Sequence, residues 1–125
     1  MTGDPPTLLV VDDEERILSA LRRSLRRDGW RVLTAGTSDE ALRMLDEEPI
    51  DVVLSDHKMP RMSGLEVLEA AARRRPNAAR ILISGWPDEI PAERLAALGV
   101  RALVPKPWDD AELKRILRAA LSGCR

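Results

Sequence analysis

The stretch Asp51-Val-Val-Leu-Ser-Asp56-His-Lys-Met-Pro-Arg-Met-Ser-Gly64 decides the fold of this chain. Its first part contains Val52, Val53 and Leu54, a short apolar run that is typical of a strand buried on both faces. The run ends in Asp56. The segment Ser63-Gly-Leu-Glu66 then has the pattern of a capping box, which predicts the start of a helix. The stretch is therefore interpreted as a buried strand, a loop and a helix.

The same alternation of strand and helix continues in both directions along the chain. Strands are predicted at 7–11, 30–35, 51–56, 80–84 and 100–104. A helix is predicted at 15–28, followed by Gly29 at the C′ position, and another at 91–98. Further helices are predicted after a capping box at Thr37, after Ser63, and after a cap at Asp109. Five strand–helix units with short connections predict an α/β fold, a doubly wound parallel sheet with helices on both faces. We expect one domain over residues 7–121, with loose termini at 1–6 and 122–125.

Composition excludes several classes of protein. The chain has 125 residues, of which 44% are hydrophobic and 33% charged, and this balance is typical of a globular domain. Its formal net charge of −1 provides no bulk attraction to nucleic acid or to an anionic membrane. The apolar runs are too short to span a bilayer. The single cysteine, Cys124, permits no internal disulfide and suggests a reducing cytoplasm.

Polar residues follow four of the predicted strands at the point where each strand ends. They are Asp12 and Asp13, then Asp56, Ser84 and Lys106. In a parallel sheet these ends meet at one edge, which is where ligands bind in open α/β sheets. Three carboxylates there repel one another, and a hard cation such as Mg²⁺ relieves the repulsion. A hydroxyl and an ammonium group suit phosphoryl oxygens, so the set indicates phosphoryl transfer to or from a carboxylate.

These residues resemble a known family over nearly the whole chain. The matching segments are Val11-Asp-Asp-Glu14, Ser55-Asp-His-Lys-Met-Pro60 with Gly64, Ile83-Ser-Gly85 and Lys106-Pro-Trp108. Together they resemble the receiver domain of two-component response regulators. The resemblance implies a flavodoxin-like fold with five helices and the strand order 2-1-3-4-5.

The resemblance also implies a metal site and a site of modification. It makes Asp56 the phosphoacceptor. Asp13 and Asp56 would bind Mg²⁺ directly, together with the backbone carbonyl of Lys58. Asp12 would bind alongside them or orient a water molecule bound to the metal.

The remaining implied roles concern the phosphoryl group and the partners. Ser84 would donate a hydrogen bond to a phosphoryl oxygen, and Lys106 would pair with the phosphoryl group. In similar domains the Lys106–Pro107 peptide bond is cis. The expected partners are a sensor histidine kinase or a phosphotransfer protein, and an output domain or partner protein outside this chain. Such a domain is a regulator that catalyses only its own modification, with no nucleic acid or membrane as its ligand.

Four further residues either adjoin the predicted site or differ from the residue usual in similar domains. Leu103 stands where similar domains usually place the aromatic residue of the conformational switch. Trp86 either shields an acyl phosphate from water or packs on its loop. Lys58 either brings a second ammonium to the metal's rim or is a solvated surface lysine. His57 lacks a histidine or cysteine partner at ligand spacing, so we interpret it as an ordinary loop histidine.

Three other functions compete with the signalling switch. An aspartyl-nucleophile phosphatase of the haloacid dehalogenase type needs Asp-x-Asp at a strand end, whereas this chain has adjacent Asp12 and Asp13. A flavin-binding module would need a phosphate loop after the first strand, where the acidic residues would repel phosphate. A phosphorylation-independent interaction domain remains open because of Leu103, although Asp13, Asp56 and Lys106 argue against it.

Overall fold

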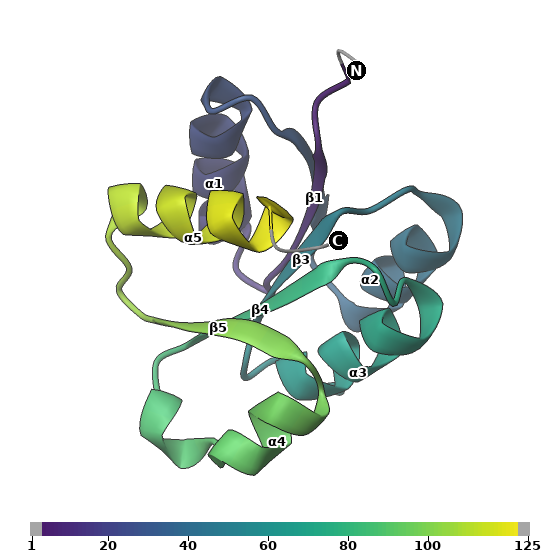
Figure 1. Ribbon diagram of the computed structural model, residues 1–125, viewed down its shortest axis with the longest axis vertical. Coiled ribbons are helices and arrows are strands. Elements are labelled where there is room, and N and C mark those ends of the chain that lie inside the picture. The colour runs from purple at the N-terminus through teal and green to yellow at the C-terminus, as the bar shows by residue number, and fades with distance from the viewer. Residues whose placement is uncertain (1–3, 123–125) are drawn as a thin grey trace.

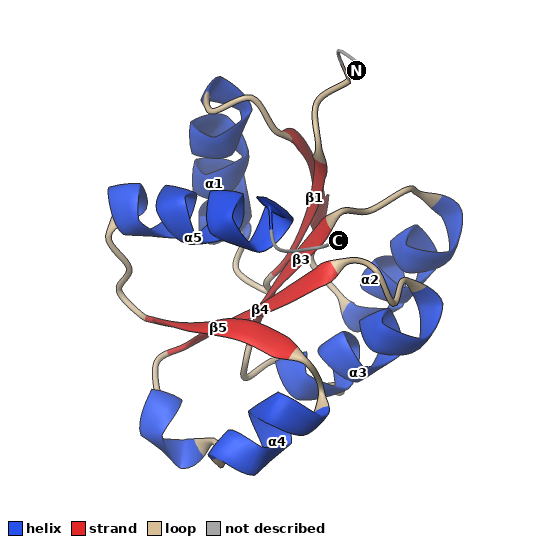
Figure 2. Cartoon of the chain, in the orientation of Figure 1, coloured by secondary structure: helices blue, strands red, loops and turns tan. Residues whose placement is uncertain are grey.

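Strands and helices alternate along the chain in the predicted order. The structure is a computed structural model that describes residues 4–122. Figure 1 shows a central sheet with helices on both faces, and Figure 2 distinguishes the helices from the strands. The elements are β1 (Thr7–Val11), α1 (Glu15–Arg27), β2 (Arg31–Ala35), α2 (Ser38–Glu47), β3 (Val52–Asp56), α3 (Gly64–Arg74), β4 (Ala79–Ser84), α4 (Ala92–Ala97), β5 (Val100–Pro105) and α5 (Asp110–Ser122).

The five strands form one parallel sheet in the order β2-β1-β3-β4-β5. This confirms the order 2-1-3-4-5 and the doubly wound α/β fold with five helices. Every residue of β1 and of β3 is buried, as expected for inner strands that are covered on both faces. The ends of these two strands are therefore held firmly by the sheet and by both helical layers.

Successive side chains of each strand point to opposite faces, so the domain has two hydrophobic cores. On the face covered by α1 and α5, Leu8 and Val10 of β1 contact leucines of both helices. On the other face, Leu9 and Val11 contact apolar residues of α2 and α3. Leu103 belongs to this second core as a partly buried side chain.

Side-chain caps begin α2, α3 and α5 as predicted, and at α5 the Asp109 carboxylate accepts the backbone N–H of Glu112 at 3.2 Å. Ser63 and Glu66 form the reciprocal capping box at the start of α3, in which each side chain accepts the other residue's backbone N–H. Thr37 caps α2 by accepting the N–H of Glu40 at 3.2 Å. The predicted box at Thr37 is incomplete, because the Glu40 carboxylate accepts the N–H of Gly36 instead. These caps satisfy N–H groups that have no partner within the helix.

The second strand begins one residue later than predicted, at Arg31 rather than at Trp30. Trp30 donates its backbone N–H to Leu25 at 3.1 Å, so it belongs to the turn that ends α1. Gly29 makes this turn possible with a φ of 95°, as its predicted place just after the helix implied. The Trp30 side chain is 3% exposed and lies in the core beneath α1 and α5.

The segment between β4 and β5 differs most from the prediction. A short 3-10 helix at Pro87–Glu89 was not predicted, and α4 covers Ala92–Ala97 rather than 91–98. The strand β4 begins at Ala79 rather than at 80, because Ala79 donates its N–H to the carbonyl of Asp51 at 2.9 Å. None of the α4 residues is buried, so no strong apolar period marked its ends in the sequence.

The predicted loose termini fall partly outside the described residues, since residues 1–3 and 123–125, with Cys124, are not described. Pro6, which was assigned to the loose N-terminal tail, accepts the backbone N–H of Arg31 at 2.8 Å. Over residues 4–122 no helix is long and apolar enough to cross a membrane.

Gly64 allows α3 to begin directly against the end of β3. A Cβ atom at this position would overlap the carbonyl oxygen of Asp56 and would lie 3.0 Å from the Cα of His57. The N–H of Gly64 also donates to the carbonyl of His57 at 2.7 Å. Backbone atoms occupy the space that a side chain would need, so the close approach depends on glycine.

We expect Gly64→Ala to lower the free energy of unfolding by about 1–3 kcal/mol, the usual cost of overpacking. The clash is with backbone atoms of a buried strand end, which cannot rotate away. Gly85→Ala is the matched control, because a Cβ there meets no atom within 4 Å. Urea unfolding of both variants tests the prediction. Equal stability of the two variants would show that α3 does not need this close approach.

Candidate functional site

Four strands end at one edge of the sheet, and each end carries a polar side chain. Asp12 and Asp13 follow β1 directly, Asp56 and Ser84 are the last residues of β3 and β4, and Lys106 follows β5. Because neighbouring strands all pair in parallel, these ends lie at the same edge. The structure thus brings together the polar residues that the sequence placed after the strands.

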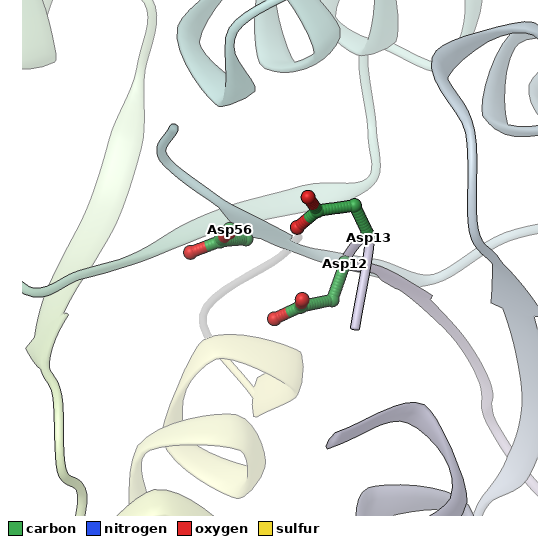
Figure 3. Close-up of side chains that lie close together, drawn as sticks. All are labelled: Asp12, Asp13 and Asp56. Atoms are coloured by element: carbon green, nitrogen blue, oxygen red, sulfur yellow. The ribbon is translucent and has the colours of Figure 1, made fainter. Parts of the chain in front are cut away.

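Asp12, Asp13 and Asp56 form the predicted acidic cluster (Figure 3). Each of them has a carboxylate oxygen within 4.8 Å of an oxygen of each of the other two. Asp12 is 2% exposed and Asp56 is 7% exposed, whereas Asp13 lies at the surface. Three carboxylates with one side open to solvent are the kind of oxygen ligands that Mg²⁺ prefers.

Lys106 brings a positive charge to the two buried carboxylates. Its ammonium nitrogen lies 2.9 Å from Oδ1 of Asp56 and 3.6 Å from Oδ2 of Asp12. Its backbone N–H donates to the carbonyl of Ser84 at 2.9 Å, which fixes the residue beside the end of β4. The Lys106–Pro107 peptide bond is cis, as the resemblance implied. Lys106 therefore reaches the cluster from a firmly placed backbone.

The crowding changes the proton affinities of these groups. Burial raises the pKa of Asp12 to about 6; the N–H of Glu14 and the charge of Lys106 oppose this rise, and the charges of Asp56 and Asp13 add to it. Burial lowers the pKa of Lys106, but the hydrogen bond to Asp56 and the charges of Asp12 and Asp56 outweigh burial and hold it above its usual value. Lys106 thus remains an ammonium group, while Asp12 is close to taking up a proton near neutral pH.

A cavity of about 290 Å³ opens from the cluster to solvent. It is lined by Asp13, Glu14, Asp56, Lys58, Gly85, Trp86 and Lys106. The negative floor and the two ammonium groups suit a small anionic group together with a cation. A phosphoryl group has that size and charge.

Lys58 and Trp86 form one side of this cavity by contacting each other. The Lys58 ammonium lies 4.3 Å from the centre of the Trp86 ring and 3.0 Å from Oε1 of Glu89. Trp86 is 53% exposed, so its ring packs against the lysine rather than in a core. These contacts connect the loop after β3 with the loop after β4.

Ser84 lies in the site, but its hydroxyl group contacts His57 instead of the acidic cluster. Its Oγ is 3.0 Å from Nδ1 of His57 and accepts the backbone N–H of Trp86 at 2.9 Å. Burial lowers the pKa of His57, and the charge of Lys58 lowers it further. The interpretation of His57 as an ordinary loop histidine does not account for this contact. The available signal was its position directly after Asp56, opposite the end of β4.

The chain has close relatives among known regulators. The model of the response regulator receiver domain matches residues 8–118. Hydrogenase transcriptional regulatory protein HoxA of Cupriavidus necator is 38% identical over 127 residues, covering 98% of this chain and 26% of HoxA. The chain spans between about a quarter and a half of the length of the curated relatives it matches.

Solved structures agree with these matches. The signal receiver domain of an HD domain-containing protein from Pseudomonas fluorescens Pf-5 has a TM-score of 0.90 at 31% identity, covering 99% of this chain and 92% of that one. The response regulator TrrA from Thermotoga maritima, in complex with Mg²⁺-BeF, has a TM-score of 0.81 at 30% identity, covering 92% and 98%. The family model spans nearly the whole described fold. The chain therefore belongs to the response regulator receiver domain family of two-component signalling systems.

Proposed function

We propose that this receiver domain is a switch that accepts a phosphoryl group on Asp56. The donor is a sensor histidine kinase or a phosphotransfer protein. The observation that supports this most directly is the setting of Asp56, a buried strand-end carboxylate 2.9 Å from the Lys106 ammonium, with two further carboxylates beside it. A carboxylate held next to both a cationic group and a cluster of metal-binding oxygens is suited to act as a nucleophile toward phosphorus.

In the proposed reaction a carboxylate oxygen of Asp56 attacks the phosphorus of a donor phosphohistidine. A P–O bond forms as the P–N bond breaks, and the donor's imidazole nitrogen keeps the electron pair. The Asp56 oxygen loses its charge in the acyl phosphate, so the Lys106 ammonium pairs with the phosphoryl oxygens instead. The Ser84 hydroxyl, buried at the end of β4, donates a hydrogen bond to the same group.

The donor set at this edge fits Mg²⁺. Asp13, Asp56 and the backbone carbonyl of Lys58 would hold the ion, and Asp12 would bind alongside or orient a metal-bound water. When bound, Mg²⁺ neutralises charge on the oxygens of the transferred group. The similar protein TrrA was solved in complex with Mg²⁺-BeF, which supports the same choice of cation here.

The proposed output lies outside the site itself. Phosphorylation would change the surface that the domain presents to an output domain or a partner protein, and the name of HoxA, a transcriptional regulatory protein, supports a regulatory output. The domain would catalyse only its own phosphorylation and dephosphorylation, in the cytoplasm, with no nucleic acid or membrane as its ligand. A single cysteine in 125 residues is in keeping with a reducing compartment.

Incubation with acetyl phosphate and Mg²⁺ should add one base-labile phosphoryl group, and Asp56→Asn should abolish the addition because an amide is a poor nucleophile. Asp51→Asn is the matched control, since Asp51 directly precedes the same strand at its far end and its carboxylate accepts the backbone N–H of Thr7 at 2.7 Å. Intact-mass measurement decides the outcome. Undiminished labelling of Asp56→Asn would place the modification elsewhere.

Asp13→Asn should raise the stability of the Mg²⁺-free protein by about 1 kcal/mol, because it removes a like charge from the cluster at a site where solvent screens the repulsion. The same variant should gain less stability from added Mg²⁺ than the wild type does. Thermal unfolding with and without Mg²⁺ measures both effects. The exposed Asp88, on the 3-10 helix, provides the control Asp88→Asn. If Asp13→Asn melts at a lower temperature without Mg²⁺ and gains as much stability from Mg²⁺ as the wild type, then Asp13 neither adds to the repulsion nor binds the ion.

Mg²⁺ affinity should fall as the pH drops from 7.5 to 5. The pKa of Asp12 is raised to about 6, so below that pH its carboxylate is protonated and the ion must displace a proton in order to bind. Each pH unit below about 6 should weaken binding by up to roughly tenfold. Calorimetric titration at several pH values measures this slope, and Asp12→Asn should flatten it. If Mg²⁺ affinity depends on pH equally steeply in Asp12→Asn, then another group takes up the proton.

A further inference from the structure

The hydroxyl of Ser84 has two neighbours with different hydrogen-bonding roles. The backbone N–H of Trp86, at 2.9 Å, can only donate, so Oγ accepts there. Nδ1 of His57, at 3.0 Å, is the second neighbour. Ser84 is fully buried, so its hydroxyl proton needs an acceptor within the protein.

The direction of the second hydrogen bond follows from this arrangement. If Nδ1 carried a proton, Oγ would accept from both neighbours and its own proton would be left without an acceptor in a buried position, which is unfavourable. If the proton of a neutral ring is on Nε2, Nδ1 accepts the hydroxyl proton and both groups are satisfied. The geometry thus favours His57 as the acceptor and Ser84 as the donor.

The backbone of His57 is fixed on both sides of this contact. Its N–H donates to the carbonyl of Ile83 at 2.8 Å, and its carbonyl accepts the N–H of Gly64 at 2.7 Å. Ile83 directly precedes Ser84, so the histidine is anchored to the strand that carries its partner. The ring is therefore placed beside Ser84 by the sheet rather than by a flexible loop.

We infer that His57 is a positioning residue that holds the Ser84 hydroxyl in a resting orientation, with its proton directed at Nδ1, until phosphorylation supplies a stronger acceptor. This inference rests on the proposed function, in which Asp56 carries the phosphoryl group. The hydroxyl has one proton, so it cannot donate to His57 and to a phosphoryl oxygen at once. Phosphorylation exchanges a neutral hydrogen bond for a charge-assisted one, which is stronger.

The chain contains a single histidine, so ¹⁵N-histidine labelling gives one ring to observe. In the unmodified protein at pH 8 the Nδ1 shift should be that of an unprotonated, hydrogen-bonded nitrogen, with the proton on Nε2. Ser84→Ala should move Nδ1 to the shift of a free acceptor. Beryllofluoride, which stands in for the phosphoryl group on Asp56, should cause the same change of the Nδ1 shift in the wild type when Mg²⁺ is present. A protonated Nδ1 in the unmodified protein, or a shift indifferent to Ser84→Ala, would overturn the inference.

A second measurement tests the consequence for the site. His57→Ala removes the competing acceptor, so beryllofluoride, added with Mg²⁺, should bind roughly two- to tenfold more tightly, the range of a net neutral hydrogen bond. His57→Asn is the matched control, because an amide oxygen can accept where Nδ1 does, and its affinity should stay near that of the wild type. In a Ser84→Ala background, His57→Ala should have no further effect.

The two proposals fail in different ways. Loss of beryllofluoride binding in every variant, the wild type included, would overturn the proposed function and this role of His57 with it. Normal binding that is unchanged by His57→Ala, or that changes equally in the Ser84→Ala background, would overturn the role of His57 alone. Thermal unfolding of each variant shows that the fold is intact, so that altered affinity reports the contact.

Discussion

Three carboxylates repel one another at one edge of the sheet, and the surrounding residues must hold them together against that repulsion. Two like charges ~4 Å apart cost about 4 kcal/mol at an effective dielectric near 20. Asp12 and Asp56 are buried, so solvent relieves little of that cost. The Lys106 ammonium, whose backbone N–H donates to the end of β4, offsets part of it. Burial raises the pKa of Asp12 to about 6, and the charges of Asp56 and Asp13 add to this rise. Three carboxylates crowded in this way repel one another, and a divalent cation bound between them would lower that electrostatic cost.

The fold provides the rigidity that such crowding requires. The inner strands β1 and β3 are buried along their whole length and are covered by one hydrophobic core on each face. Their ends cannot move apart to relax the repulsion without breaking both cores. The exposed groups at this edge are instead on the loops, such as Lys58 and Trp86, which contact each other at one side of the cavity. The buried strands therefore keep this edge of the sheet rigid, and the loops at the same edge carry the exposed groups.

Sequence patterns could predict whatever depends on neighbours along the chain. Alternating apolar runs, capping residues and Gly29 gave the elements, and residues at strand ends gave the acidic cluster and Lys106. Interactions between distant segments could not be read in this way. The hydroxyl of Ser84 contacts His57, 27 positions away, and Pro6 accepts the backbone N–H of Arg31 on β2. Strand order came from the family resemblance, because periodicity alone does not specify which strands pair.

Because Trp86 contacts Lys58 beside the site, the intrinsic fluorescence of Trp86 can report on changes in the site. An indole's emission depends on nearby charge and on solvent, and the Trp86 ring has an ammonium group 4.3 Å from its centre while half of its surface faces water. Trp30 is buried and Trp108 is partly buried against the same core, and neither lines the cavity. A rearrangement of the two loops therefore alters the environment of Trp86 directly. The molecule thus carries its own optical reporter at the mouth of the site.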